Sequence, residues 1–320
     1  MKHLLAIEQL SREEIEAILD RAESFAEVGR RDIKKVPTLR GRTVVTLFYE
    51  SSTRTSSSFE LAAKRLSADL VSVKAAGSSV DKGESLKDTV TTLSAYDPAA
   101  IVIRHPYAGA AQMVAEWTEA AVVNAGDGKH EHPSQALLDV YTLRRRLGSL
   151  DGKRIWIVGD VLHSRVARSN LIAFQRMGAE VTVCGPPTLI PRGIEELGCE
   201  VSHSLERLGE AEVVYTLRMQ QERMSESFVP SLREYAAIFQ IDSRRLNPRQ
   251  LLMHPGPVNR GVELSGEAID SPQSLIAEQV AAGLVVRMAI LYELLAGGER
   301  PTPLSEGAGA VRPTPIGQPA

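Results

Sequence analysis

The stretch TVVTLFYESSTRTSSSFELAAKRL, residues 43–66, decides the fold class of this chain. Its first six residues, 43–48, are β-branched or apolar, which is typical of a short buried strand. A polar loop follows at 50–55, and a helical pattern then runs to Leu66. A strand that leads through a polar loop into a helix is the first part of the βαβ unit from which parallel sheets are built.

The same alternation of strands and helices extends to both sides of this stretch. Before it, Ser11 and Glu14 form a capping-box pattern, and apolar residues at helical spacing predict an amphipathic helix over 12–27. After it, the pattern predicts strands at 70–73, 100–103, 122–124, 154–158, 180–184, 213–217 and 251–254, and helices at 132–147, 164–177 and 272–295. The chain is therefore expected to be an α/β protein with parallel sheets.

Length and charge narrow the classes of function. At ~150 residues per domain, 320 residues predict two domains, each with a core of its own. The chain has 37 Lys and Arg against 40 Asp and Glu, a formal net charge of -3, so it has no overall attraction for nucleic acid or for an anionic membrane. A site that binds an anion must therefore be a local cluster of basic groups.

The sequence also argues against a membrane protein and against a metal framework. No apolar run reaches the ~18 residues that a membrane span needs, and the acidic residues from Glu8 onward come too early for a signal peptide. The two cysteines, Cys184 and Cys199, form no CxxC pair, so we expect neither a structural zinc site nor a disulfide framework. These features predict a cytoplasmic protein.

The loop 51–55, SSTRT, is the first candidate binding site. Hydroxyl groups and successive backbone N–H groups lie there at a helix N-terminus, where the helix dipole favours an anion. Arg54 adds a permanently charged guanidinium group that suits phosphate oxygens. Taken alone, the string also fits a Ser/Thr N-cap with a surface arginine. It does not match GxxxxGK[ST], so it does not predict a nucleotide P-loop.

Three further polar segments are candidates because of their position. Lys82 lies in a loop of small and polar residues at 77–84, which by itself would be a surface loop. Arg104 directly follows a predicted strand, and ligands of open α/β sheets bind beyond the carboxyl ends of the strands. His132 and Gln135 lie about one turn apart at a predicted helix start, although a capping histidine fits the same spacing.

Together these segments resemble the motifs of a known family. The string FYESSTRT at 48–55, with SFE at 58–60, is similar to the carbamoyl-phosphate signature of the aspartate and ornithine carbamoyltransferases. The family's other motifs are matched in the same order by KGE at 82–84, RHP at 104–106, NAGDG at 124–128 and HPSQ at 132–135. The resemblance covers the chain from about residue 4 to residue 296.

The resemblance implies a carbamoyl phosphate site in the first half of the chain. Its phosphate would be bound by Ser52, Thr53, Arg54 and Thr55, its carbamoyl oxygen by Arg104, His132 and Thr55, and its amino group by Gln135 as the acceptor. The residues implied to be catalytic are Arg54, Thr55, Lys82, Arg104 and His132. Preset donors would stabilise the developing oxyanion more than the substrate. Phosphate is a competent leaving group, so we expect no metal and no organic cofactor.

The same resemblance implies an active site that is shared between subunits. Ser78 and Lys82 would reach into the carbamoyl phosphate site of the neighbouring subunit in a homotrimer. Lys82 would also contact the second substrate.

The second half of the chain is expected to bind the amine acceptor. The segment 159–169 lacks GxGxxG, which disfavours a dinucleotide site, and it resembles the family segment whose arginine, here Arg165, binds the α-carboxylate of aspartate. The family's R-x-Q-x-E-R loop and its amine-orienting turn are matched by Arg218 and Gln220, which would hold the β-carboxylate, and by the backbone of Pro255, Gly256 and Pro257. Two arginines suit a dicarboxylate and would repel the cationic side chain of ornithine.

Two details refine the comparison with the family. The run MHPGPVNRGVE at 253–263 is close to the form in bacterial aspartate enzymes that associate with dihydroorotase, which makes dihydroorotase a candidate partner. The ornithine branch carries H-C-L-P there, and this chain has no cysteine at that place. The family usually has a second arginine directly after S-T-R-T, where this chain has Ser56.

We therefore expect two doubly wound parallel-sheet domains linked by interdomain helices. The expected division is a carbamoyl-phosphate domain at 1–131 plus 272–296, a linking helix at 132–149, an aspartate domain at 150–271 and a disordered tail at 297–320. The implied reaction is carbamoyl transfer to L-aspartate in de novo pyrimidine biosynthesis. The alternatives are a carbamoyltransferase for another amine, an inactive carbamoyltransferase-like scaffold and a nucleotide-binding Rossmann protein.

Overall fold

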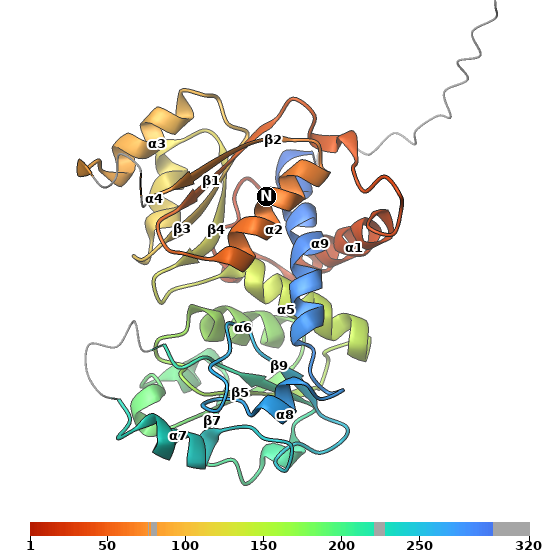
Figure 1. Ribbon diagram of the computed structural model, residues 1–320, viewed down its shortest axis with the longest axis vertical. Helices are drawn as coiled ribbons and strands as arrows, with labels where there is room; N and C mark the ends of the chain where they lie inside the picture. Colours follow the sequence, from red (N-terminus) through yellow and green to blue (C-terminus); the bar gives the residue numbers. More distant parts are fainter. Residues whose placement is uncertain (76, 78–81, 221–227, 297–320) are drawn as a thin grey trace, which may run out of the picture.

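The computed structural model describes residues 1–75, 77, 82–220 and 228–296 (Figure 1). The tail that we expected to be disordered, 297–320, and the predicted site residue Ser78 lie outside these residues. Each half of the chain forms one sheet with helices around it, and the two halves meet at α5 and α9 (Figure 1). Across the described ranges, we find no helix that is both long and apolar enough to span a bilayer.

The first sheet has four parallel strands in the order β2-β1-β3-β4. They are β1 (Thr43–Phe48), β2 (Asp69–Lys74), β3 (Ala100–His105) and β4 (Ala121–Asp127). Strand β1 has a neighbour on each side, and its residues from 44 to 48 are all buried. Burial on both faces explains why its sequence is a nearly continuous apolar run and does not alternate.

The second sheet has five parallel strands in the order β7-β6-β5-β8-β9. They are β5 (Arg154–Val158), β6 (Glu180–Cys184), β7 (Glu200–Ser202), β8 (Val213–Thr216) and β9 (Leu251–Met253). In both sheets the chain order reverses beside an interior strand, β1 in the first sheet and β5 in the second. Ligands of open α/β sheets bind beyond the carboxyl ends of the strands at such a switch point.

Serine side chains cap the start of six of the helices that the structure describes. In each case the hydroxyl accepts a hydrogen bond from a backbone N–H of the first turn, as at Ser11, Ser52, Ser85, Ser164, Ser231 and Ser265. The α-helices are α1 (Arg12–Val28), α2 (Thr53–Arg65), α3 (Leu86–Ser94), α4 (Ala110–Trp117), α5 (Pro133–Leu147), α6 (Arg165–Arg176), α7 (Leu232–Phe239), α8 (Gly266–Ile269) and α9 (Ile276–Leu295). Short 3-10 turns lie at Ile7–Gln9, Pro37–Leu39, Pro187–Leu189, Ile194–Leu197 and Leu208–Glu210.

Helices α5 and α9 tie the two halves into one body. Every side chain of α5 from Pro133 to Leu143 is buried, and α9 packs against α1, α2 and α5 (Figure 1). One hydrophobic cluster contains Val44 of the first sheet, Leu137 of α5 and Ile155 of the second sheet. The two sheets therefore share a continuous core, and the loops at their carboxyl ends are held in fixed positions relative to each other.

The predicted strands and helices are confirmed, with shifts at some of their ends. Strand β3 continues two residues further than expected, so Arg104 lies within the strand and does not follow it. Helix α9 begins at Ile276, where a start at residue 272 was expected. The reason is a tertiary contact, because residues 273–275 run beside β9 and exchange backbone hydrogen bonds with Leu252. Strand β7 was not predicted, since three residues are too few to give a pattern.

Replacing Leu291 by alanine is expected to destabilise the protein. Leu291 has no exposed surface and lies in the cluster through which α9 packs on the rest of the chain. Loss of a buried leucine typically costs about 2–5 kcal/mol, because a cavity remains. Urea denaturation measures the free energy of unfolding. Ile238→Ala on α7, where the isoleucine is 57% exposed, is the control and should change this free energy by no more than about 0.5 kcal/mol. An equal loss in both variants would contradict the proposed core.

Candidate active site

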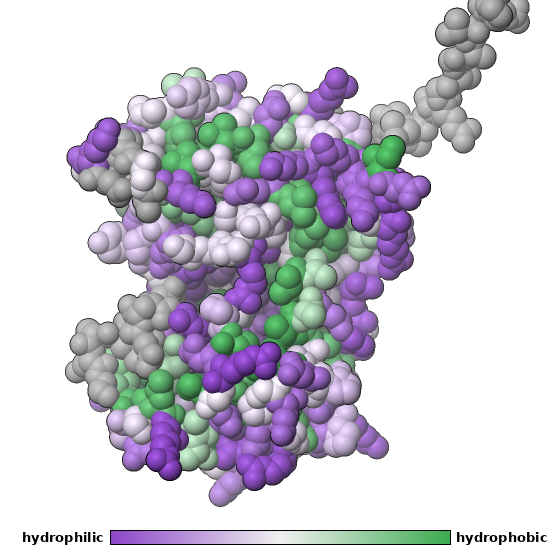
Figure 2. Space-filling view, viewed as in Figure 1, coloured by the Kyte–Doolittle hydropathy of each residue, from purple (hydrophilic) through white to green (hydrophobic). Residues whose placement is uncertain are grey.

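A cavity of about 1220 Å³ lies where the carboxyl ends of the two sheets approach each other. Its walls come from the end of α1, the start of α2, the end of β3, the segments after β8 and β9, one side of α5, the start of α6 and one side of α9. Apolar side chains at the position of α9 form a strip on this face of the molecule (Figure 2). From this helix, Val280, Ala281, Leu284 and Val285 line the cavity.

The structure brings together predicted site residues from both halves of the chain. Those that line the cavity are Ser52, Thr53, Arg54, Thr55, Arg104, His132, Gln135, Arg165, Arg218, Gln220, Pro255, Gly256 and Pro257. Lys82 is exposed and does not line this cavity. Ser78, and the acidic and basic positions 222 and 223 of the R-x-Q-x-E-R loop, lie outside the described residues.

The start of α2 is built to hold an anion. The Ser52 hydroxyl accepts a hydrogen bond from the backbone N–H of Thr55 at 3.4 Å and so begins the helix directly after the loop from β1. The residues of the first turn line the cavity, which places the positive end of the helix dipole beside it. Ser56, which stands where the family usually has an arginine, does not line the cavity, and its hydroxyl bonds to Glu60 at 2.9 Å.

Arg54 lies against the backbone of a turn from the other half of the chain. A Cβ atom built on Gly256 would fall 1.7 Å from Arg54 Nη1, so only glycine leaves room for this guanidinium group. Gly256 also has a φ of +61°, which disfavours any side chain. Partial burial lowers the pKa of Arg54, and the Arg218 cation lowers it further against the opposing effect of Tyr215. Two cations from different halves thus face the same space, which suits an anionic ligand.

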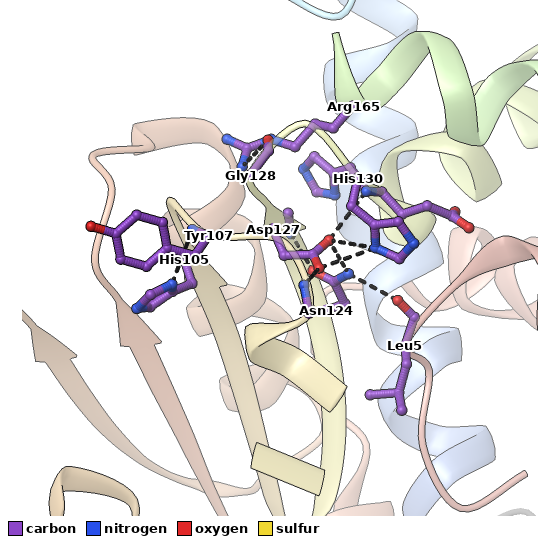
Figure 3. Close-up of polar contacts among 12 residues, drawn as sticks. Leu5, His105, Tyr107, Asn124, Asp127, Gly128, His130 and Arg165 are labelled. Carbon is purple, nitrogen blue, oxygen red and sulfur yellow. Dashed lines mark hydrogen bonds and ion pairs between the residues drawn. The ribbon is translucent and has the colours of Figure 1, made fainter. Parts of the chain in front are cut away.

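Glu50 pairs with two of the arginines that line the cavity. Its Oε2 lies 3.2 Å from Arg104 Nε and also accepts a hydrogen bond from Arg165 Nη2. Arg165 is 3% exposed, and its Nη1 donates to the Gly128 carbonyl at 3.3 Å (Figure 3). No sequence pattern predicts a role for Glu50, because its partners lie far along the chain. Its place between a strand end and SSTRT was the available signal.

The loop between β4 and α5 is shaped by a buried carboxylate, Asp127 (Figure 3). Asp127 accepts hydrogen bonds from the Asn124 amide at 2.7 Å and from the backbone N–H groups of Gly109 at 2.7 Å and Glu131 at 3.1 Å. His130 Nδ1 lies 3.1 Å from the same carboxylate. This network explains the NAGDG motif as the support that places the Gly128 carbonyl and the start of α5.

The two histidines of the predicted motifs differ in position. His105 Nδ1 accepts a hydrogen bond from the Tyr107 backbone N–H at 3.1 Å, and burial lowers its pKa (Figure 3). His105 does not line the cavity, and its ring supports the backbone after β3. His132 is the N-cap of α5 and is 3% exposed, and its backbone N–H donates to Ser169 Oγ at 2.8 Å. Its ring borders the cavity close to Arg104 and Gln135.

The turn after β9 is fixed by one side chain of α9 and by one of its own side chains. The backbone N–H of His254 donates to Gln279 Oε1 at 3.0 Å, and the N–H of Gly256 donates to His254 Nδ1 at 2.7 Å. Burial lowers the pKa of His254, which keeps the ring neutral and its Nδ1 available as an acceptor. At the neighbouring strand end, the Gln220 backbone N–H donates to Asp160 Oδ2 at 3.1 Å.

Arg287 is a cation that the sequence patterns did not assign to the site. It lies within α9, is 3% exposed, borders the cavity and stacks over the Phe59 ring at 5.1 Å. Burial lowers its pKa to about 10, against the opposing effect of Asp139. In the sequence it is one of two charges within the mostly apolar run 281–295, which gives no sign of a binding role. Within the described ranges, no group of three or more histidine, cysteine and carboxylate side chains could hold a metal ion.

Two family models together match almost the whole chain. The model described as "Aspartate/ornithine carbamoyltransferase, carbamoyl-P binding domain" matches residues 2–145, and the model described as "Aspartate/ornithine carbamoyltransferase, Asp/Orn binding domain" matches residues 151–294. The fold and the cluster of cations between two parallel sheets are thus those of a two-part carbamoyltransferase. The chain belongs to the aspartate/ornithine carbamoyltransferase family.

Individual relatives narrow the similarity within this family. The chain is 55% identical over 303 residues to the aspartate carbamoyltransferase catalytic subunit of Acidothermus cellulolyticus, covering 93% of this chain and 94% of that one. The corresponding subunit of Pelotomaculum thermopropionicum is 56% identical and is covered to 98%. Among solved structures, aspartate transcarbamoylase of Trypanosoma cruzi in complex with aspartate and phosphate has a TM-score of 0.84 at 34% identity, covering 92% of this chain and 97% of that one.

Gly256→Ala is expected to weaken the binding of inorganic phosphate. The new methyl group would displace the Arg54 guanidinium from the cavity. Loss of a charge-assisted hydrogen bond costs about 1.5–3 kcal/mol, which corresponds to roughly 10- to 100-fold in the dissociation constant. Isothermal titration calorimetry measures it.

Gly261→Ala is the matched control for this substitution. Gly261 also has a positive φ, +85°, but a Cβ atom there meets nothing within 4 Å. This variant carries the backbone strain without the collision, so its phosphate affinity should stay within about twofold of the unmodified protein. If both variants bind phosphate equally well, the contact between Arg54 and Gly256 has no role in the site.

Proposed function

We propose that the chain is the catalytic chain of an aspartate carbamoyltransferase. It transfers the carbamoyl group of carbamoyl phosphate to the amine of L-aspartate and releases N-carbamoyl-L-aspartate and phosphate, in de novo pyrimidine biosynthesis. The observation that carries this proposal is the convergence of Arg54, Arg104, Arg165 and Arg218 on one cavity. The names of the relatives, aspartate carbamoyltransferase catalytic subunits, support the choice of substrates.

The start of α2 would bind the phosphate group of carbamoyl phosphate. Ser52, Thr53, Arg54 and Thr55 line the cavity at the positive end of the helix dipole. Ser78 and Lys82 of a neighbouring subunit complete the proposed phosphate site. The negative charge of this substrate offsets the repulsion between Arg54 and the other cations.

Donors beside the carbamoyl oxygen would accelerate the chemical step. In the reaction, the amine nitrogen of aspartate attacks the carbonyl carbon, and the carbonyl oxygen gains negative charge. Thr55, Arg104 and His132 donate to this oxygen, and Gln135 accepts from the carbamoyl amino group. The carbon–oxygen bond to phosphate then breaks, and the departing phosphate accepts the proton that the nitrogen loses. Preset donors favour the charged intermediate over the substrate, and no metal or organic cofactor takes part.

The acceptor would bind between the arginines of the second half. Arg165 holds the α-carboxylate of aspartate, and Arg218 and Gln220 hold the β-carboxylate. The backbone of residues 255–257 orients the amine, and Lys82 of the neighbouring subunit lies close by. Arginine pairs with carboxylates in a fixed planar geometry, which gives selectivity as well as charge. The ammonium group of ornithine would face these cations and be repelled.

The proposed assembly is a cytoplasmic homotrimer in which each active site is shared. Lys82 is exposed and lies outside the cavity of its own chain, which fits a role in a neighbouring subunit. We assign residues 1–131 plus 272–296 to the carbamoyl-phosphate domain, 132–149 to the linking helix and 150–271 to the aspartate domain. Dihydroorotase is proposed as a partner on the resemblance of residues 253–263 alone.

A colorimetric ureido assay across amine acceptors tests the proposed reaction. With carbamoyl phosphate present, we expect turnover of L-aspartate and none of ornithine, because two arginines attract the former and repel the latter. Arg218→Ala should raise the KM for aspartate by roughly 10- to 100-fold and weaken phosphate binding much less, because Arg218 acts on the phosphate site only through its charge beside Arg54. Turnover of ornithine but not of aspartate would show that the proposed acceptor is wrong. No turnover of any amine would favour an inactive scaffold.

Mixing two inactive variants tests the shared site. Arg54→Ala and Lys82→Ala chains each form inactive homotrimers, but a hybrid contains sites with an intact Arg54 from one chain and an intact Lys82 from the next. Random mixing in a cyclic trimer should restore up to about a quarter of the sites. Arg54→Ala mixed with Arg104→Ala is the control and should restore none, because both residues line the cavity of the same chain. Equal activity of the two mixtures would exclude a shared site.

A further inference from the structure

Asp139 is a fully buried carboxylate beneath the cavity, one helical turn after Gln135 on α5. Four side-chain amide or hydroxyl groups from four elements donate to it. They are Gln135 Nε2 of α5 at 3.1 Å, Asn170 Nδ2 of α6 at 3.0 Å, Tyr215 OH of β8 at 2.7 Å and Gln279 Nε2 of α9 at 2.7 Å. The carboxylate thus has a donor for each of its lone-pair directions, and it joins elements of both halves of the chain.

An ionised carboxylate only accepts hydrogen bonds, and this fixes the amide of Gln135. The Nε2 group must face Asp139, and the Oε1 atom then points away from this carboxylate. Gln135 borders the cavity, so its free acceptor is available to a ligand there. With a neutral or donating group in place of Asp139, the amide could turn over and present a donor in its place.

The same carboxylate also supports the turn after β9. Gln279 donates to Asp139 through Nε2 and accepts from the His254 backbone N–H through Oε1. The chain of hydrogen bonds therefore runs from Gln135 through Asp139 and Gln279 to the backbone that precedes Gly256. Two segments that line the cavity thus share one buried carboxylate.

We propose that Asp139 is a positioning residue that makes the protein select carbamoyl phosphate over isosteric acyl phosphates, by forcing Gln135 to present an acceptor. This inference rests on the proposed function for the identity of the substrate. The carbamoyl amino group donates to Gln135 Oε1, whereas a methyl group of the same size leaves that buried oxygen without a partner. Burying an acceptor without a hydrogen bond costs binding free energy, so Gln135 Oε1 distinguishes the amino group of the substrate from a methyl group.

Acetyl phosphate is the probe, because it carries a methyl group where carbamoyl phosphate carries NH₂. Dissociation constants for carbamoyl phosphate, acetyl phosphate and inorganic phosphate are measured by calorimetry on the full chain and on Asp139→Asn. In the variant we expect carbamoyl phosphate to bind roughly 5- to 10-fold more weakly, while the other two ligands change by less than about twofold. The selectivity ratio, and not overall affinity, is therefore the readout.

Tyr215→Phe is the matched control within the same cluster. It removes one donor to Asp139 and the contact of the Tyr215 hydroxyl with Gln135, but it leaves the carboxylate and its bond to Gln135 Nε2 in place, so the ratio of carbamoyl to acetyl phosphate affinity should stay unchanged. Equal weakening of all three ligands in Asp139→Asn would show a purely structural role and overturn the proposal. An unchanged ratio would overturn it too. Carbamoyl transfer by the unmodified protein is measured separately, so failure of the proposed reaction remains distinguishable from failure of this inference.

The unmodified chain supplies the same test should Asp139→Asn not fold. Burial raises the pKa of Asp139 to about 6, against the lowering effect of its hydrogen bonds. The charged or titratable groups that face it are Tyr215 of β8, whose pKa burial raises well above 10, and Arg287 of α9, whose pKa burial lowers to about 10. Neither titrates between pH 5 and pH 8, and Asn170 of α6 is neutral. Changes at the phosphate or at His132 affect both acyl phosphates alike and cancel in the ratio.

The selectivity ratio should therefore be constant above pH 7 and fall as the pH drops through about 6. A protonated Asp139 offers one acceptor fewer, and the Gln135 amide is released to turn over. A ratio that is flat from pH 8 to pH 5 would contradict the proposal.

Discussion

Arg54 lies in α2 and Arg218 follows β8 in the other half of the chain, yet each lies within reach of the other's charge, and the Arg218 cation contributes to the lowered pKa of Arg54. Bringing like charges together opposes folding, so the elements that carry them must be held by interactions elsewhere. The continuous core through α5 and α9 provides this, because it fixes the carboxyl ends of the two sheets relative to each other. The cavity can then hold cations that a mobile interface would allow to separate.

Two carboxylates near the clustered arginines have different partners. Glu50, with its side chain 23% exposed, pairs with Arg104 and Arg165, which line the cavity, so an anionic ligand must compete with it or share its partners. Asp139 lies beneath the cavity with no exposed surface and is saturated by neutral donors. It therefore orients neighbouring amides without neutralising the arginines. The site still attracts anions, because Asp139 orients neutral amides and does not pair with the arginines.

The sequence predicts what is local and misses what depends on distant partners. Thr43–Phe48 is predicted with its bounds, because burial on both faces of an interior strand leaves a short apolar run. The site residues were found through motifs, and thirteen predicted side chains or backbone positions from both halves border one cavity. The start of α9 was wrong, since residues 273–275 pair with β9. Glu50 and Asp139 had no pattern of their own, because their roles come from partners on other strands and helices.

The clustered cations serve the proposed chemistry as well as substrate binding. An α-amine attacks a carbonyl carbon only in its neutral form, and a nearby positive charge disfavours the protonated form. In the proposed complex, aspartate with its carboxylates on Arg165 and Arg218 would place its amine between these groups and Arg54. The phosphate group offsets part of that positive charge. The fraction of neutral amine therefore depends on how much positive charge remains around it. The clustered arginine cations repel one another and so oppose folding, but the same positive charge would favour the neutral, reactive amine of the proposed substrate. This effect requires both halves of the chain to hold their arginines at the same cavity.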